Sequence, residues 1–132
     1  MKGTTMANYG EYTLLIVDDE EILRETIIFD FKRMGFKILS AGNGTDAFEL
    51  VKKNKIHLVI SDIRMPGGDG MSLLDQIRGY DPSIPTVIFM TGFADITEEQ
   101  AIARGARKVL GKPFDRKVLI YSVLDALGIP SA

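Results

Sequence analysis

The chain has 132 residues, of which 45% are hydrophobic and 26% are charged, a balance typical of one globular domain rather than of a disordered chain. A formal net charge of −2 gives no basic excess for a nucleic-acid-binding surface, and the absence of cysteine excludes disulfides, thiolate catalysis and cysteine metal sites. No apolar run approaches the roughly 18 residues of a membrane span, and no signal peptide is evident, so we expect a cytoplasmic protein with no membrane contact.

We predict a flexible leader over residues 1–11, which are polar and contain glycine, one domain over residues 12–128, and a C-terminal tail over residues 129–132. Within the domain, short apolar runs alternate with helical patterns, and the runs predict five strands, at 13–17, 36–40, 58–61, 86–90 and 108–110. Three runs (LLIV, LVI and VIFM) are continuously apolar, which is typical of strands covered on both faces in a parallel sheet.

Five helical patterns follow the predicted strands. The first carries an apolar stripe that a glycine ends, namely Leu23, Ile27, Phe31 and Met34 followed by Gly35. The second follows the turn at residues 42–44, and the third follows the segment MPGGDG. The fourth begins near Thr97, which has the spacing of a capping box with Gln100, and the fifth ends at Gly128.

Alternating strands and helices predict right-handed crossovers onto a parallel sheet. Five such units indicate a doubly wound α/β domain with a five-stranded parallel sheet, strand order 2-1-3-4-5, and helices on both faces. In this order the chain reverses direction between the first and third strands, and ligands bind there, beyond the carboxyl ends of the strands. Functional residues are therefore expected directly after the apolar runs.

Five polar residues occupy those positions: Asp18, Asp19, Asp62, Thr91 and Lys112. The three carboxylates offer hard oxygen ligands that suit Mg²⁺, which keeps several waters and takes few protein carboxylates. Without a cation, mutual repulsion is expected to raise the pKa of at least one carboxyl group. This explains why an apolar strand ends in the acidic run DDEE.

Asp62 stands apart from the other two carboxylates, because it ends its strand alone and opens a loop rich in proline and glycine. A carboxylate beside a divalent cation can attack phosphorus and form an aspartyl phosphate. Phosphoryl transfer needs mainly positioning and neutralisation of oxygen charge. The Lys112 ammonium can contact one phosphoryl oxygen and the Thr91 hydroxyl another, while Gly92 leaves room for a donor.

Each of these features has a simpler interpretation when taken alone. Asp18 or Asp19 could cap the following helix, and the segment after Asp62 could be an ordinary turn-rich loop. Lys112 could be a surface lysine, and Thr91 could simply end its strand. Their occurrence together, at the ends of the appropriate strands and in order, favours a single phosphoryl-transfer site.

The segments VDDEEILRETI, SDIRMPGGDG, MTG and GKPF resemble the receiver (REC) domain of two-component response regulators, and the resemblance extends over residues 13–127. It implies a flavodoxin-like receiver fold in which Asp62 is the phosphoacceptor. It also implies that Asp18, Asp19, Asp62 and the backbone carbonyl of Arg64 hold Mg²⁺, and that Thr91 and Lys112 contact the phosphoryl group. A cis bond between Lys112 and Pro113 is implied as well.

One position departs from the family pattern. Receiver domains commonly carry tyrosine or phenylalanine three residues before the lysine, and here that position is Val109. The aromatic part of the family's switch is therefore expected to be weaker or to use other contacts. Arg64 and Phe93 resemble residues that tune phosphoryl lifetime, so we predict that they control access of the attacking water.

The resemblance implies a phosphorylation-controlled switch without turnover of an external substrate. A histidine kinase, or a histidine phosphotransfer protein in a phosphorelay, supplies the phosphoryl group to Asp62 with Mg²⁺. The added charge then biases the surface of the fourth helix, fifth strand and fifth helix, which binds an effector, an output domain or a second copy of the chain.

Three alternatives stay open at this point. A pseudo-receiver would bind partners without being phosphorylated. A Mg²⁺-dependent hydrolase of the haloacid-dehalogenase type would need a second aspartate two residues after the nucleophile, where this chain has Arg64. A flavin-binding electron carrier of the same topology would place phosphate against the acidic run DDEE, which would repel it.

Overall fold

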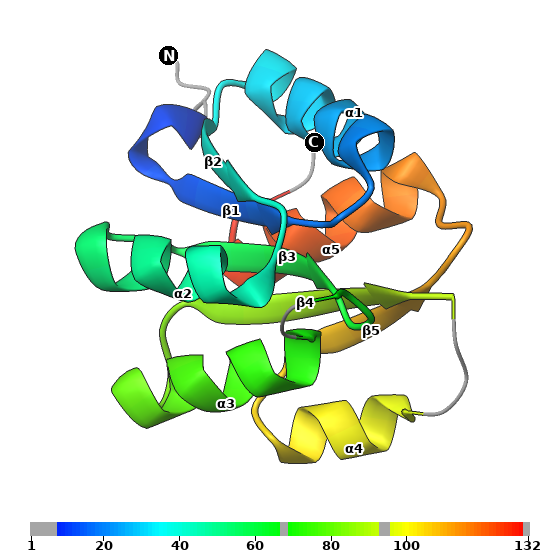
Figure 1. The fold of residues 1–132 in the computed structure, drawn as a ribbon. Coiled ribbons are helices and arrows are strands. Elements are labelled where there is room, and N and C mark those ends of the chain that lie inside the picture. Colours follow the sequence, from blue (N-terminus) through cyan, green and yellow to red (C-terminus); the bar gives the residue numbers. More distant parts are fainter. Residues whose placement is uncertain (1–7, 67–68, 93–95, 131–132) are drawn as a thin grey trace.

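The computed structural model describes residues 8–66, 69–92 and 96–130. A turn of 3-10 helix comes first, at Tyr9–Glu11, and five strands then alternate with five helices (Figure 1). The strands are β1 (Thr13–Val17), β2 (Lys37–Ala41), β3 (Leu58–Asp62), β4 (Thr86–Thr91) and β5 (Lys108–Gly111). The helices are α1 (Glu21–Met34), α2 (Gly44–Lys53), α3 (Gly70–Tyr80), α4 (Glu98–Ala103) and α5 (Arg116–Leu127).

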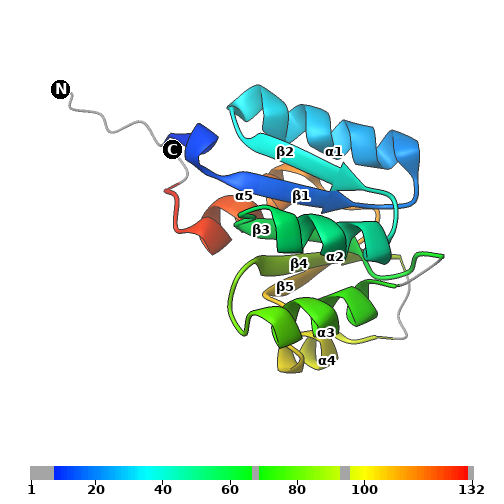
Figure 2. The same ribbon diagram turned by 60° about the vertical axis from the view of Figure 1, so that its left-hand side comes forward.

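The strands form one parallel sheet in the order β2-β1-β3-β4-β5, which confirms the predicted fold. Helices α1 and α5 lie on one face of the sheet, and α2, α3 and α4 lie on the other (Figure 2). All five strands point the same way, so their carboxyl ends meet at one edge. Among the described residues, no helix is both long enough and apolar enough to cross a membrane.

Alternate residues of the strands pack on opposite faces of the sheet. In β1, Leu15 and Val17 contact the core under α2, α3 and α4, whereas Leu14 and Ile16 contact the core under α1 and α5. All four side chains are fully buried, and burial of such a side chain stabilises a fold by roughly 1.5–3 kcal/mol. The central strands are therefore continuously apolar because both of their faces are covered.

The helix termini follow the predicted signals. Gly35 ends α1 with a positive φ of 111°, and Gly128 ends α5 in the same left-handed region. Thr97 and Gln100 form both bonds of the capping box, since each side chain accepts from the backbone N–H of the other residue, at 2.8 and 3.1 Å. These local contacts explain why the helix boundaries were predictable from short motifs.

Residues just outside the predicted range of 12–128 also contact the core. Tyr9, within the predicted leader, stacks on Phe36 with ring centroids 4.9 Å apart. Ile129, within the predicted tail, is buried, and its N–H donates to the Leu124 carbonyl at 2.8 Å. Residues 1–7 and 131–132 lie outside the described part of the chain.

Candidate functional site

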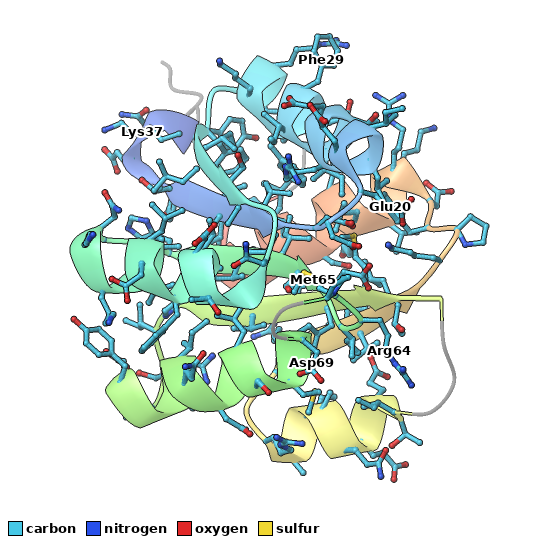
Figure 3. The ribbon with its side chains drawn as sticks, in the orientation of Figure 1. Glu20, Phe29, Lys37, Arg64, Met65 and Asp69 are labelled. Atoms are coloured by element: carbon cyan, nitrogen blue, oxygen red, sulfur yellow. The ribbon has the colours of Figure 1, made fainter. Side chains whose placement is uncertain are left out.

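An open pocket of about 540 Å³ lies at the carboxyl edge of the sheet. Its lining comes from the ends of β1, β3, β4 and β5: Asp19, Glu20, Asp62, Arg64, Met65, Pro66, Gly92 and Lys112. Figure 3 shows Glu20, Arg64 and Met65 at this end of the sheet, away from Lys37 at the start of β2. The pocket is where the strand order predicted a ligand site.

Asp62 is the last residue of β3 and is 6% exposed. Lys112 Nζ donates to its Oδ2 at 2.9 Å, and the Arg64 N–H approaches its Oδ1 at 3.4 Å. One oxygen of Asp62 thus contacts an ammonium, while the other lies toward the loop after β3. Residues 50 positions apart in sequence meet here because β3 and β5 end at the same edge.

Asp18 is completely buried at the end of β1. Its Oδ1 accepts from the Glu20 N–H at 2.8 Å, and its Oδ2 accepts from Lys112 Nζ at 3.3 Å. The N-cap residue of α1 is Glu20, so Asp18 does not serve as the helix cap that the simpler interpretation suggested. Arg24, which the sequence analysis missed, donates from Nη1 to the Asp18 carbonyl at 2.5 Å and fixes this turn on α1.

The electrostatics of the site are dominated by burial and by Lys112. Burial is the largest cause that raises the pKa of Asp18, and the Asp62 charge adds to it, while the Glu20 N–H and Lys112 oppose it. Burial would lower the pKa of Lys112, but the hydrogen bond to Asp62 and the charges of Asp18 and Asp62 outweigh it, so this pKa is raised. Lys112 therefore stays an ammonium ion at neutral pH. The predicted rise in a carboxyl pKa occurs, although repulsion is only its secondary cause.

Three carboxylates can offer oxygens to one cation. Asp18, Glu20 and Asp62 each place one oxygen within 4.8 Å of the others. An all-oxygen set of this kind fits Mg²⁺, which prefers carboxylates and water. Asp19, predicted as a ligand, is exposed and lines the same pocket but is not one of these three residues. Glu20 was missed as a ligand candidate, although the acidic run DDEE contained the signal.

Most of the other predicted residues have a defined place in the structure. Thr91 is buried at the end of β4, and Gly92 beside it lines the pocket. Val109 is partly buried against the core under α4, and its N–H donates to Glu98 Oε2 at 3.1 Å. The Lys112–Pro113 bond is cis. Phe93 lies outside the described residues.

Gly70, the first residue of α3, packs directly beneath the loop that follows Asp62. Its N–H donates to the Ile63 carbonyl at 2.7 Å. A Cβ on Gly70 would lie 2.5 Å from the Asp62 carbonyl oxygen and 2.9 Å from Ile63 Cα. Only glycine allows this close approach of α3 to the end of β3, so Gly70 sets the position of the Asp62 backbone.

Comparison with known proteins identifies a family whose sequence pattern matches most of this chain. The response regulator receiver domain family matches residues 14–124. The transcriptional regulatory protein ZraR of Klebsiella oxytoca is 36% identical over 120 residues, covering 89% of this chain and 27% of the relative. The regulatory protein AtoC of Escherichia coli is 37% identical over 119 residues, covering 89% of this chain and 26% of the relative.

Solved structures agree with this match. The receiver domain of NtrX from Brucella abortus superposes with a TM-score of 0.81 at 31% identity, covering 89% of this chain and 99% of that one. The response regulator TrrA from Thermotoga maritima, solved in complex with Mg²⁺ and BeF, gives a TM-score of 0.80 at 28% identity, covering 88% and 99%. The chain spans about a quarter of the length of the curated relatives named above. On the match across most of its sequence, the chain belongs to the two-component response regulator receiver domain family.

Proposed function

We propose that Asp62 is a phosphoacceptor and that its phosphorylation switches a partner-binding surface on this domain. The observation that carries the proposal is the placement of Asp62 in an open pocket, 2.9 Å from the Lys112 ammonium and within 4.8 Å of oxygens from Asp18 and Glu20. This combination provides a nucleophilic carboxylate, a fixed cation and a set of oxygen ligands for a metal.

In the proposed reaction, an Asp62 carboxylate oxygen forms a bond to the donor's phosphorus, and the bond from phosphorus to the donor's leaving atom breaks. The electron pair of that bond stays with the leaving group. Lys112, already held against Asp62 and Asp18, compensates charge that develops on a phosphoryl oxygen. Mg²⁺ bound by Asp18, Asp62, the Arg64 carbonyl and Asp19 or Glu20 would supply further positive charge to the phosphoryl oxygens.

The phosphoryl group adds roughly −1.5 to −2 charge beside Thr91 and Lys112. We propose that both residues move toward it and that the change reaches the face formed by α4, β5 and α5. Glu98 in the first turn of α4 already accepts from the β5 backbone at Val109, so α4 and β5 are connected where the aromatic residue of other receivers is missing. This hydrogen bond is a candidate substitute for that residue in the switch.

The partners follow from the same proposal. A histidine kinase or a histidine phosphotransfer protein donates the phosphoryl group, and the switched face binds an output domain, an effector or a second copy of the chain. Relatives named as regulatory proteins are much longer than this chain, which supports an output domain as one destination. We expect this to occur in the cytoplasm and without turnover of an external substrate.

The direct test is phosphorylation with acetyl phosphate and Mg²⁺, resolved on a phosphate-affinity gel. The parent protein is expected to give a shifted band that is labile to heat and acid, whereas Asp62→Asn gives none because amide oxygen is a poor nucleophile. Asp125→Asn, the same change at an exposed position on α5, should shift like the parent. If the parent shows no band with this donor or with a phosphorylated histidine protein, the pseudo-receiver alternative replaces the proposal.

Arg64→Ala is expected to shorten the lifetime of the phosphorylated form severalfold. The Arg64 side chain is exposed and lines the mouth of the pocket, so its removal should admit the attacking water more easily. The measurement is the loss of the shifted band after the donor is removed. Arg33→Ala, at an exposed arginine in the last turn of α1, is the control. An unchanged lifetime in Arg64→Ala would show that Arg64 does not control water access. The corresponding prediction for Phe93 stands untested.

A further inference from the structure

A bidentate ion pair joins α1 to the first residue of α5. Arg116 Nε donates to Asp30 Oδ2 at 2.9 Å, and Arg116 Nη2 donates to Asp30 Oδ1. The Asp30 side chain is only 9% exposed, whereas that of Arg116 is 63% exposed. A bidentate contact fixes the orientation of the Arg116 side chain as well as its distance from Asp30, because two parallel hydrogen bonds hold the planar guanidinium.

Arg116 lies four residues after Lys112, at the far end of the loop between β5 and α5 (Figure 1). At the near end, the Lys112 N–H donates to the Thr91 carbonyl at 2.8 Å. Asp115 caps α5 by accepting from the Lys117 N–H at 2.7 Å. The loop that carries Lys112 is therefore anchored to β4 at one end and, through Arg116 and Asp30, to α1 at the other.

Asp30, Arg116 and Lys112 also share a groove of about 460 Å³, which Glu20 connects to the phosphoryl-transfer pocket. Arg116 compensates the Asp30 charge within this groove. Without Arg116, the largely buried Asp30 carboxylate would face the groove unpaired and would attract the Lys112 ammonium on its flexible stem. The ion pair thus acts in two ways, by anchoring the loop and by removing a competing anion.

We propose that Asp30 and Arg116 are positioning residues for Lys112, and that their ion pair sets the rate at which Asp62 is phosphorylated. The inference rests on the proposed function, because it assigns the pair a role in that reaction. Neither residue touches the reacting atoms. Small displacements of a group that stabilises a transition state can reduce rates by up to about 100-fold, so the pair can matter for chemistry while contributing little to stability.

The chain provides a matched control at the opposite end of α5. Arg107 Nη2 donates to Asp125 Oδ2 at 3.1 Å, which joins the segment before β5 to the last part of α5. This pair is exposed, and Arg107 directly precedes β5, whereas Lys112 directly follows it. Disrupting either pair removes one arginine–carboxylate contact of α5, but only the Asp30–Arg116 pair adjoins the loop of Lys112.

The experiment measures phosphorylation by acetyl phosphate at saturating donor, as a function of Mg²⁺ concentration. The variants are Arg116→Gln, Asp30→Asn, the two combined, and Arg107→Gln. We expect the maximal rate to fall about 3- to 10-fold in each of the first three variants. The loss should be largest in Arg116→Gln, which leaves the Asp30 anion unpaired, and the double variant should resemble Asp30→Asn. The Mg²⁺ concentration at half-maximal rate should stay unchanged, because carboxylates rather than the loop hold the metal. Arg107→Gln should match the parent.

Amide hydrogen exchange of Lys112 provides a second measurement that needs no phosphorylation. Because its N–H bonds to Thr91, exchange should be at least severalfold faster in Arg116→Gln and Asp30→Asn than in the parent and Arg107→Gln. If the parent takes no phosphoryl group, the proposed function fails while exchange still decides whether the pair fixes the loop. Parent-like rates and exchange in Arg116→Gln, or equal losses in Arg107→Gln, would overturn the inference.

Discussion

Gly70→Ala is expected to destabilise the domain by about 2–3 kcal/mol, the cost of forcing a methyl group into a closely packed interior. The new Cβ would lie 2.5 Å from the Asp62 carbonyl oxygen, 2.8 Å from Phe89 Cε1 and 2.9 Å from Ile63 Cα. Two of these atoms belong to the backbone and cannot rotate away. Relief requires that α3 and the end of β3 separate, which also displaces Asp62.

Gly79→Ala in the same helix is the control for this experiment. Nothing lies within 4 Å of a Cβ at Gly79, and the residue is exposed. Replacing an unconstrained helical glycine by alanine should stabilise the protein by roughly 0.5–1 kcal/mol. Urea unfolding followed by far-UV circular dichroism gives both values. A Gly70→Ala variant as stable as the parent would show that α3 is not held this tightly against β3.

Lys112→Met is expected to lower the free energy of unfolding by roughly 1–3 kcal/mol near neutral pH, in protein whose metal has been removed with EDTA. The loss should be smaller than for a fully enclosed ion pair, because the pocket is open to solvent. The change deletes the ammonium that contacts Asp18 at 3.3 Å and Asp62 at 2.9 Å. Both carboxylates are almost fully buried and would lose their shared cation. Phosphorylation of Asp62 should fall in the same variant, since Lys112 no longer compensates the phosphoryl charge.

The cost of Lys112→Met should shrink on mild acidification. Burial raises the pKa of Asp18 in the folded protein above its pKa in the unfolded chain. Protonation of Asp18 therefore stabilises the fold, and this stabilisation is complete below the unfolded-state pKa and is lost as the pH rises through the folded-state pKa. Lys112 lowers the Asp18 pKa, and its removal raises that pKa further. Because Lys112 has a raised pKa, its own contribution is lost only at alkaline pH, above its ordinary value of 10.5. Protonation of Asp18 in mild acid should therefore relieve part of the variant's destabilisation.

Lys108→Met controls for the loss of one positive charge, because Lys108 is exposed on β5, the strand that Lys112 directly follows. Its free energy of unfolding should differ from that of the parent by less than about 0.5 kcal/mol at both pH values. The Lys112 prediction is contradicted if Lys112→Met matches the parent at neutral pH, or if its destabilisation is the same in mild acid.

The sheet and the meeting of Asp18, Asp62 and Lys112 were predictable because they follow from periodic patterns. Continuous apolar runs indicated covered strands, and right-handed crossovers oblige parallel strands to end at one edge. Residues directly after those runs must then approach one another, whatever the details of the side chains. Caps at Thr97 and Gly35 were predictable for a similar reason, since their hydrogen bonds span only a few residues.

The sequence by itself thus determined the fold, the position of the pocket and most of the residues that surround it. The tertiary structure alone decided which neighbour joins Asp18 and Asp62, since the turn after β1 places the Glu20 oxygen rather than that of Asp19 beside them. It also decided the pairing of Asp30 with Arg116, which are 86 residues apart, and the close contact of Gly70 with Asp62. Such contacts depend on the position of each helix on the sheet to within about an ångström. No local pattern of residues encodes the distance between a helix and the sheet to that precision.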